Sequence, residues 1–330
     1  MSAPIKIVVT DYIEPDLNWE AEQLAQYKNV IFEHHQLKFK SREEILAVVQ
    51  DADVILVNMV PFDAALIAGL KKCKLIIRHG AGYDNVDVEA ATNKGIRVAY
   101  EPDYCADEVA QHAVMLILAS WRKLSTGRRV LEASSKTGKW DFTPIYPIYS
   151  LVGKTVGILG CGRIGSLVLK LLSGFEFNIK ICDPYLSKER QAELGLHTES
   201  LETVLKESDI VTVHAALTKE TRNLIGEKQL RMMKPTAHLI NCARGALVDT
   251  NALAKAIREK WIAGAGIDVY VKEPPDPNFP LFDLDEVILA PHLSWYSEES
   301  GWSIRKKIVE DFVRFIENRP PRFLINKTLA

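Results

Sequence analysis

Short apolar runs rich in Val and Ile alternate along the chain with longer segments whose apolar residues recur at helical spacing. Such uninterrupted runs are typical of parallel strands that helices cover on both faces. The pattern occurs twice. The first series predicts strands over residues 5–10, 30–35, 53–58, 74–80 and 96–100, and the second over residues 155–160, 179–183, 210–215, 237–243, 264–269 and 287–291.

Helix signals accompany these runs. The segment "SREEILAVV" begins with Ser41 and carries Glu44 three positions later, a capping box that predicts a helix start. After the first series comes a long helical stretch, "DEVAQHAVMLILASWRKLS", and then an aromatic loop over residues 140–149. A last helix, predicted over residues 297–318, follows the final strand and could return to the first series.

The chain has 330 residues, which is more than one ordinary core accommodates. The fold class that we expect is α/β, with two Rossmann-like, doubly wound parallel-sheet domains. Residues 1–102 and 296–330 are predicted to form a flavodoxin-like substrate domain. Residues 103–295 are predicted to form the NAD-binding Rossmann domain, because they contain the six strands that a dinucleotide-binding sheet needs.

Composition and charge exclude several function classes. The formal net charge of −2 leaves no broad basic surface for nucleic acid. Apolar runs such as "AVMLILA" are far shorter than the roughly 20 residues of a membrane span, and the N-terminal segment does not resemble a secretion signal. Five scattered cysteines lack metal or redox spacing and fit free thiols. A soluble, cytoplasmic protein without membrane or nucleic-acid partners is therefore expected.

The strongest local motif is "TVGILGCGRIGSLVLKLL", in which an apolar strand runs into Gly160, Gly162 and Gly165 and a helix follows. These glycines permit a tight turn, close approach of the backbone to a pyrophosphate, and close packing of helix against strand. The N–H groups at the helix start favour the diphosphate charge. The motif therefore predicts a dinucleotide site.

A second strand ends at Asp183, about 20 residues after the glycines, where a carboxylate accepts hydrogen bonds from ribose hydroxyls and repels a 2′-phosphate. NAD is therefore expected rather than NADP. The alternative is that Asp183 is only a turn residue before Pro184.

Candidate catalytic side chains follow three later strands. Reduction of a carbonyl carbon by hydride requires a proton donor and a cation near the oxygen. Arg244 can grip a carboxylate and its adjacent carbonyl oxygen, His292 can carry the proton, and Glu273 can fix the imidazole tautomer. Each has a plain alternative: a surface or capping arginine, a solvated glutamate and a buried histidine. His292 has no His or Cys neighbour at ligand spacing, so no metal is expected.

Several motifs together resemble the signatures of the D-isomer-specific 2-hydroxyacid dehydrogenase family over roughly residues 50–330. In chain order they are "RHGAGYDNVD", "GILGCGRIG", "DPYLS", "VHAALTKETRNLIG", "LINCARGALVD", "IDVYVKEP" and "APHLSWYSE". Within that family, "DPYLS", "PHLSWYSE" and the closing "INK" are most similar to the C-terminal-binding protein branch.

The resemblance implies an active site in the cleft between the two domains. It implies a catalytic triad of Arg244, Glu273 and His292, and a homodimer through the NAD-binding domain, with the helix from Asp107 and residues 140–149 as contacts. The implied substrate-binding residues are Arg78, Gly80, Ala81, Gly82 and Trp295. The implied cofactor-binding residues are Gly160, Gly162, Arg163, Ile164, Gly165, Asp183, Thr221, Cys242, Ala243, Arg244, Asp268 and His292.

The leading functional hypothesis is an NAD-dependent oxidoreductase that reversibly reduces a 2-oxo acid to its D-2-hydroxy acid. Trp295 favours a substrate with an apolar, aromatic or thioether side chain. One alternative is an NAD(H)-sensing scaffold of the C-terminal-binding protein type, which recruits peptide partners. Another is a phosphite- or formate-type dehydrogenase on the same scaffold. Formate dehydrogenases of this superfamily carry glutamine where Glu273 stands, which disfavours that activity.

Overall fold

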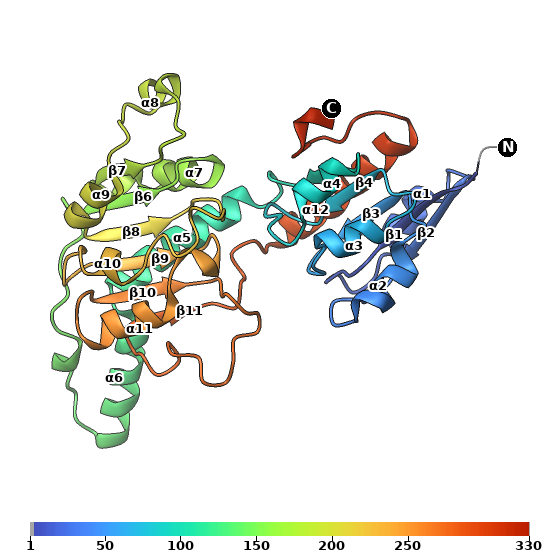
Figure 1. The fold of residues 1–330 in the computed structure, drawn as a ribbon. Helices are drawn as coiled ribbons and strands as arrows, with labels where there is room; N and C mark the ends of the chain where they lie inside the picture. Colours follow the sequence, from blue (N-terminus) through green and yellow to red (C-terminus); the bar gives the residue numbers. More distant parts are fainter. Residues whose placement is uncertain (1–2, 330) are drawn as a thin grey trace. The chain divides into compact units, whose positions relative to one another are not determined.

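A computed structural model describes residues 3–329. The chain divides into two compact units: unit 1 consists of Met1–Cys105 and Ser297–Ala330, and unit 2 of Ala106–Tyr296 (Figure 1). All eleven predicted strand segments contain a strand, and both sheets are entirely parallel. The predicted α/β class is therefore confirmed.

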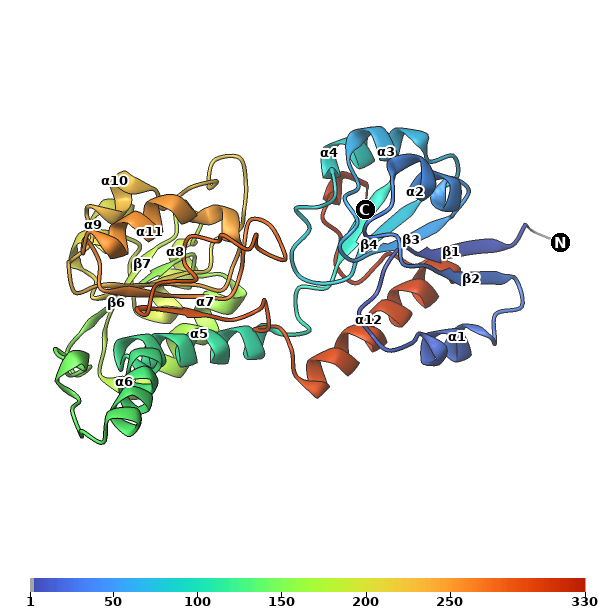
Figure 2. The same cartoon turned by 90° about the horizontal axis from the view of Figure 1, so that it is seen from below.

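Unit 1 is built on a five-stranded sheet of order β2-β1-β3-β4-β5, the order of flavodoxin-like sheets. Its strands are β1 (Ile5–Val9), β2 (Val30–His34), β3 (Val54–Val57), β4 (Leu75–Arg78) and β5 (Arg97–Tyr100). One face carries α2 (Arg42–Val49), α3 (Ala64–Gly69) and α4 (Val88–Asn93), and the other carries α1 (Asn18–Leu24) and α12 (Glu298–Ile316) (Figure 2).

The C-terminal helix belongs to this N-terminal sheet. Helix α12 buries Ile304, Ile308 and Phe312 in one apolar cluster with Ile7 and Leu75 of the strands. It begins after Ser297, whose hydroxyl accepts from the Ser300 N–H at 2.9 Å. The capping box predicted from the sequence is also present, because Ser41 and Glu44 exchange side-chain and backbone hydrogen bonds at the start of α2. Both starts follow from the need to satisfy the first N–H groups of a helix.

Unit 2 contains a six-stranded sheet of order β11-β10-β9-β8-β6-β7. The strands are β6 (Thr155–Leu159), β7 (Asn178–Cys182), β8 (Ile210–Val213), β9 (His238–Asn241), β10 (Gly264–Ile267) and β11 (Val287–Leu289). Because the direction of progression reverses between β6 and β8, their carboxyl ends form a topological switch point, the usual ligand position in open α/β sheets.

Helices cover both faces of this sheet (Figure 2). Helices α5 (Ala106–Trp121) and α7 (Arg163–Leu172) pack together on one face. The other face carries α9 (Leu201–Glu207), α10 (Glu227–Leu230) and α11 (Thr250–Arg258), while α8 (Lys188–Leu194) follows β7. Unit 2 also contains the short 3₁₀ helices η1 (Thr143–Ile145), η2 (Ser173–Phe175) and η3 (Gly245–Leu247), and unit 1 contains η4 (Lys327–Leu329).

The helical stretch predicted from Asp107 to Ser125 proves to be two helices. Helix α5 ends at Trp121, Lys123 adopts a left-handed conformation with φ of 51°, and α6 (Leu124–Thr137) follows. None of the side chains of α6 is buried, and its sequence, LSTGRRVLEASSKT, is predominantly polar, so it lacks the apolar run that marks α5. For residues 3–329, no helix combines the length and apolar character that a membrane crossing needs.

Unit 1 also contains a cluster of buried charges at the end of β5. Arg322 donates to Glu101 at 3.0 Å and to Asp103 at 2.9 Å, and its backbone N–H donates to Asp311 at 2.8 Å. Lys307 also contacts Asp103 at 2.9 Å. Burial raises the pKa of Glu101 to about 8, helped by the charge of Asp311, and burial raises the pKa of Asp311 to about 6.

These shifts predict a pH dependence of stability. A carboxyl group whose pKa is raised by folding holds a proton that the unfolded chain has released, so the free energy of unfolding falls as pH rises. For this cluster the fall extends from about pH 4 to about pH 8. We expect Asp311→Asn, which keeps the acceptor for the Arg322 N–H, to lessen this fall by about 1–3 kcal/mol.

Urea unfolding of wild type and Asp311→Asn at pH 5, 6, 7 and 8 measures the effect. Glu43→Gln removes an exposed carboxylate from the same unit and should leave the wild-type slope unchanged. Equal slopes for wild type and Asp311→Asn would refute the assignment.

Candidate active site

The glycine motif forms the turn between β6 and α7. Gly160 has a φ of 90°, and a Cβ added there would lie 2.7 Å from the Ala215 nitrogen, which follows β8. A Cβ on Gly165 would collide with the Gly160 carbonyl oxygen. A Cβ on Gly162 would meet nothing within 4 Å. Two glycines thus permit close packing within the chain, while the third leaves open space beside the helix start, where a pyrophosphate would fit.

Asp183 lies directly after β7 and connects to this turn. One carboxylate oxygen accepts from the Cys161 N–H at 2.9 Å, and the other accepts from the Tyr185 N–H at 3.0 Å. A carboxylate has about four acceptor positions, so these two bonds leave capacity for ribose hydroxyls. The side chain of Asp183 therefore stabilises the glycine turn and still has acceptor positions for the predicted hydrogen bonds with ribose hydroxyls.

Hydrogen bonds from side chains to the backbone stabilise the loops that follow β8 and β9. The Thr221 hydroxyl donates to the Ala216 carbonyl at 2.7 Å and accepts from the Thr218 N–H at 2.7 Å. Asn241, which sequence reasoning did not single out, accepts from the Ala243 N–H at 3.0 Å and donates to the Arg244 carbonyl at 2.9 Å. In the sequence, Asn241 could have been recognised as the polar residue that ends an apolar run.

Two of the predicted catalytic side chains are in direct contact. His292 Nδ1 lies 2.8 Å from Glu273 Oε2, and Glu273 Oε1 accepts from the Tyr270 N–H at 3.1 Å. Burial raises the pKa of Glu273, but the hydrogen bond with His292 and the charges of His292 and Arg244 together lower the pKa below its ordinary value. Glu273 is therefore an ionised acceptor that orients the imidazole.

Gly245 allows the segment of Arg244 to approach that of Glu273. A Cβ on Gly245 would lie 2.5 Å from the Val271 nitrogen, so any side chain would force the two segments apart. Tyr270, also missed from sequence, donates its hydroxyl to the Ala290 carbonyl at 2.7 Å. Burial raises the pKa of Tyr270 to about 12, which keeps the phenol a donor. These contacts bring Arg244, Glu273 and His292 to the carboxyl end of one sheet.

Asp268 holds the turn that contains His292. Its side chain is fully buried, and its oxygens accept from the Leu293 N–H at 2.8 Å and the Ser294 N–H at 3.0 Å. His112 Nε2 lies 3.7 Å from the same carboxylate. His292 has a φ of 55°, a left-handed conformation that is rare outside glycine. The predicted contact of Asp268 with the nicotinamide amide stays a prediction.

The predicted substrate-binding residues of unit 1 follow β4. Arg78 donates to the His79 carbonyl, and Gly80 has a φ of 136°. The Gly80 N–H donates to the Arg78 carbonyl at 2.9 Å, and the Gly80 carbonyl accepts from the Glu101 N–H at 3.1 Å. Since the Gly80 N–H is engaged within the chain, Ala81 and Gly82 become the better candidates to bind a carboxylate. In unit 2, Trp295 is half-buried and packs edge to face on Tyr296 at 5.2 Å between ring centroids.

No group of three His, Cys, Asp or Glu side chains within residues 3–329 is arranged to hold a metal ion. The candidate chemistry described above uses a guanidinium, a carboxylate and an imidazole, which supply charge stabilisation and proton transfer without metal ligands.

Comparison with known proteins identifies the class. Residues 114–294 match the family model described as "D-isomer specific 2-hydroxyacid dehydrogenase, NAD binding domain". A glyoxylate reductase from Thermococcus litoralis is 39% identical over 299 residues, 88% of each chain. The chain therefore belongs to the D-isomer specific 2-hydroxyacid dehydrogenase family and is an NAD-dependent oxidoreductase.

Solved structures agree with this assignment. A glyoxylate reductase from Paecilomyes thermophila superposes with a TM-score of 0.87 at 28% identity and covers 99% of this chain and 100% of its own. A D-lactate dehydrogenase from Aquifex aeolicus, complexed with NAD and lactic acid, gives a TM-score of 0.85 at 27% identity, with 97% and 98% covered. The narrower likeness to the C-terminal-binding protein branch stays a prediction.

The open space at Gly162 predicts how two glycine variants differ. Gly162 has a φ of −71°, which any residue adopts, so Gly162→Ala should fold normally and weaken NADH binding by about tenfold or more. Gly165→Ala should instead lower the free energy of unfolding by about 1–3 kcal/mol, because its methyl group meets the Gly160 carbonyl.

Fluorescence titration with NADH and urea unfolding, applied to both variants, separate the two effects. Unchanged NADH affinity in Gly162→Ala would contradict the position inferred for the pyrophosphate.

Proposed function

We propose that this chain catalyses the reversible reduction of a 2-oxo acid to its D-2-hydroxy acid, with Arg244, Glu273 and His292 as catalytic residues. The observation that supports this most directly is the 2.8 Å contact of His292 Nδ1 with Glu273. The charge of Arg244 acts on the same carboxylate. Membership of the family makes a 2-oxo acid the substrate class that this constellation serves.

Each residue has a role that its chemistry explains. Glu273 engages Nδ1 of His292, so the opposite ring nitrogen, Nε2, delivers the proton to the substrate carbonyl oxygen during reduction and removes it during oxidation. The guanidinium of Arg244 grips the substrate carboxylate and carbonyl oxygen together and stabilises the charge that develops on that oxygen. NADH, when bound, supplies the hydride. The N–H groups of Ala81 and Gly82 bind the substrate carboxylate, with Arg78 nearby.

For the substrate side chain we propose an uncharged, predominantly apolar group. The family relatives described above include glyoxylate reductases, whose named substrate carries only hydrogen beside its oxo group. Trp295 presents a half-buried aromatic surface three residues after His292. Both observations favour glyoxylate and apolar 2-oxo acids over phosphorylated or dicarboxylic ones.

A panel of 2-oxo acids tests the proposal. NADH oxidation at 340 nm is measured with glyoxylate, pyruvate, phenylpyruvate and 4-methylthio-2-oxobutyrate, and with oxaloacetate and 3-phosphohydroxypyruvate as charged competitors. We expect kcat/KM for the best substrate with an uncharged side chain to exceed kcat/KM for the two substrates with a charged side chain by about tenfold or more. Arg244→Ala should lower kcat/KM by about 100-fold or more.

Arg222→Ala, at an exposed arginine of the same unit, serves as the matched control and should keep wild-type kcat/KM. A chain that oxidises NADH with no member of the panel, or an Arg244→Ala variant with unchanged kcat/KM, would rule the proposal out. Peptide partners captured only with NADH and without turnover would point to the sensing scaffold instead. Turnover with phosphite or formate would point to the other alternative.

We further propose that the chain acts in the cytoplasm. All five cysteines are free thiols, and Cys105, Cys161 and Cys242 are buried. Unpaired cysteines throughout a chain of this size fit a reducing compartment.

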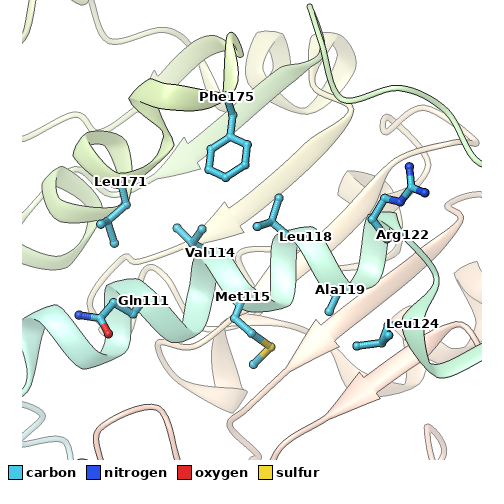
Figure 3. Close-up of a pocket in the computed structure, with 9 residues that line it drawn as sticks. All are labelled: Gln111, Val114, Met115, Leu118, Ala119, Arg122, Leu124, Leu171 and Phe175. Carbon is cyan, nitrogen blue, oxygen red and sulfur yellow. The ribbon is translucent and has the colours of Figure 1, made fainter. Parts of the chain in front are cut away.

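We also propose a homodimer through unit 2. Helix α6 buries none of its side chains. Large apolar side chains are therefore left on the surface: Leu131 is 54% exposed, and Trp140, just beyond the helix, is 78% exposed. On the α5 face, an apolar groove runs between Met115 and Leu118 of α5 and Leu171 and Phe175 (Figure 3). Helices that bury no apolar face are seldom stable alone, so a second copy is the occupant that we expect on these surfaces.

Met115→Glu tests this assembly. A carboxylate in the apolar groove should weaken dimerisation by about 100-fold or more, because the charge would lose its hydration at the interface. Light scattering after size-exclusion chromatography reports the mass in solution. Phe39→Glu, at an 85% exposed side chain of unit 1, should leave the wild-type dimer intact. A wild-type mass equal to one chain would refute the homodimer.

A further inference from the structure

The segment after β1 carries two acidic side chains that reach into neighbouring loops. Asp11, buried, accepts from the Asn58 N–H at 3.2 Å and the Met59 N–H at 2.7 Å. Glu14 Oε1 lies 3.1 Å from His79 Nε2, and these two side chains are only 10% and 5% exposed. None of the catalytic roles assigned above uses Glu14 or His79.

His79 lies next to the loop that is proposed to bind the substrate carboxylate. His79 immediately precedes the loop Gly80–Gly82, and its backbone N–H donates to the Val57 carbonyl of β3 at 2.8 Å. The Gly80 carbonyl is held by the Glu101 N–H at 3.1 Å. Backbone bonds therefore tether the start of the loop, and the contact with Glu14 fixes the side chain beside it. A shift of the His79 ring would be transmitted to Gly80 across one peptide unit.

The electrostatics of the pair are consistent with a permanent charge on Glu14. Burial raises the pKa of Glu14, but the hydrogen bond and charge of His79, with two backbone N–H groups, lower the pKa to about 2. The charge of Arg305 also acts on Glu14, although Arg305 itself is held by both oxygens of Glu20 at 2.6 Å.

We propose that the Glu14–His79 pair is a positioning element that holds the Gly80–Gly82 loop for the substrate carboxylate, and so sets the affinity for the 2-oxo acid. This inference rests on the function proposed above, in which that loop binds the carboxylate. Glu14 and His79 act through the loop and leave proton transfer at His292 unaffected. Their loss should therefore change KM for the 2-oxo acid and spare kcat.

Steady-state kinetics with glyoxylate and NADH test the proposal on the full-length protein. Glu14→Gln and His79→Gln replace the carboxylate or the imidazole by an amide of similar volume that can still hydrogen-bond. Each should raise KM for glyoxylate by about tenfold, the effect of one lost charge-assisted hydrogen bond. We expect kcat and KM for NADH to stay within about twofold. The double variant should resemble either single variant, because the two residues act as a unit.

Glu20→Gln is the matched control. It removes a buried carboxylate of the same unit that pairs with Arg305, whereas Glu14 pairs with His79, the residue before the loop. This variant should lose stability and keep the wild-type KM for glyoxylate. Binding of oxamate, an unreactive analogue of a 2-oxo acid, to the NADH complex gives a second measurement below the unfolding temperature of every variant. Glu14→Gln should weaken oxamate binding by about tenfold as well.

The outcomes separate this inference from the proposed function. Wild-type turnover with unchanged KM in Glu14→Gln and His79→Gln would overturn the inference and leave the proposed function intact. A tenfold rise of KM in Glu20→Gln would show that any buried charge lost from unit 1 has the same effect, which also overturns it. A wild type that reduces no 2-oxo acid would overturn the proposed function and this inference with it.

Discussion

The candidate active site of unit 2 depends on one buried carboxylate. Asp268 has no exposed surface, and both of its oxygens accept backbone N–H groups from the two residues after His292. A charge in an apolar interior is tolerated when hydrogen bonds satisfy it, and these bonds exist only if the turn keeps its present shape. They offset the cost, about 1–3 kcal/mol, of the left-handed backbone at His292. The position of the imidazole therefore follows from a residue that need not touch the substrate.

Close backbone approach is the second constraint on this site. Gly160 packs against the chain after β8, Gly165 against the Gly160 carbonyl, and Gly245 against the segment of Tyr270 and Val271. In each case a Cβ would occupy the place of main-chain atoms, which cannot move without disturbing a strand end. Gly162 differs because the space beside it is open. The same residue type thus serves two purposes, internal packing and access for a ligand.

Unit 1 uses buried acids in a comparable way. Asp11 holds the loop after β3, Glu14 holds His79 after β4, and Glu101 pairs with Arg322 at the end of β5. The pKa of Glu14 falls and that of Glu101 rises, because hydrogen bonds and an adjacent cation outweigh burial at Glu14, whereas burial outweighs Arg322 at Glu101. Acidic side chains at the ends of parallel strands therefore shape the loops that follow those strands.

The sequence alone determined the two parallel sheets, the glycine turn and the residue types that follow each strand. Strands covered on both faces are continuous apolar runs, and strand ends are local features of that pattern. Helix α6 was missed because its sequence is predominantly polar and because the left-handed turn at Lys123 leaves no mark in the hydrophobic pattern. The tertiary structure alone decided which groups meet. Asp268 lies 25 and 26 residues before the two N–H groups that donate to it, and Tyr270 donates to the carbonyl of Ala290, 20 residues away. Such bonds join segments that are distant in sequence, and their geometry depends on how strands and loops pack in three dimensions, which no local pattern of residues records.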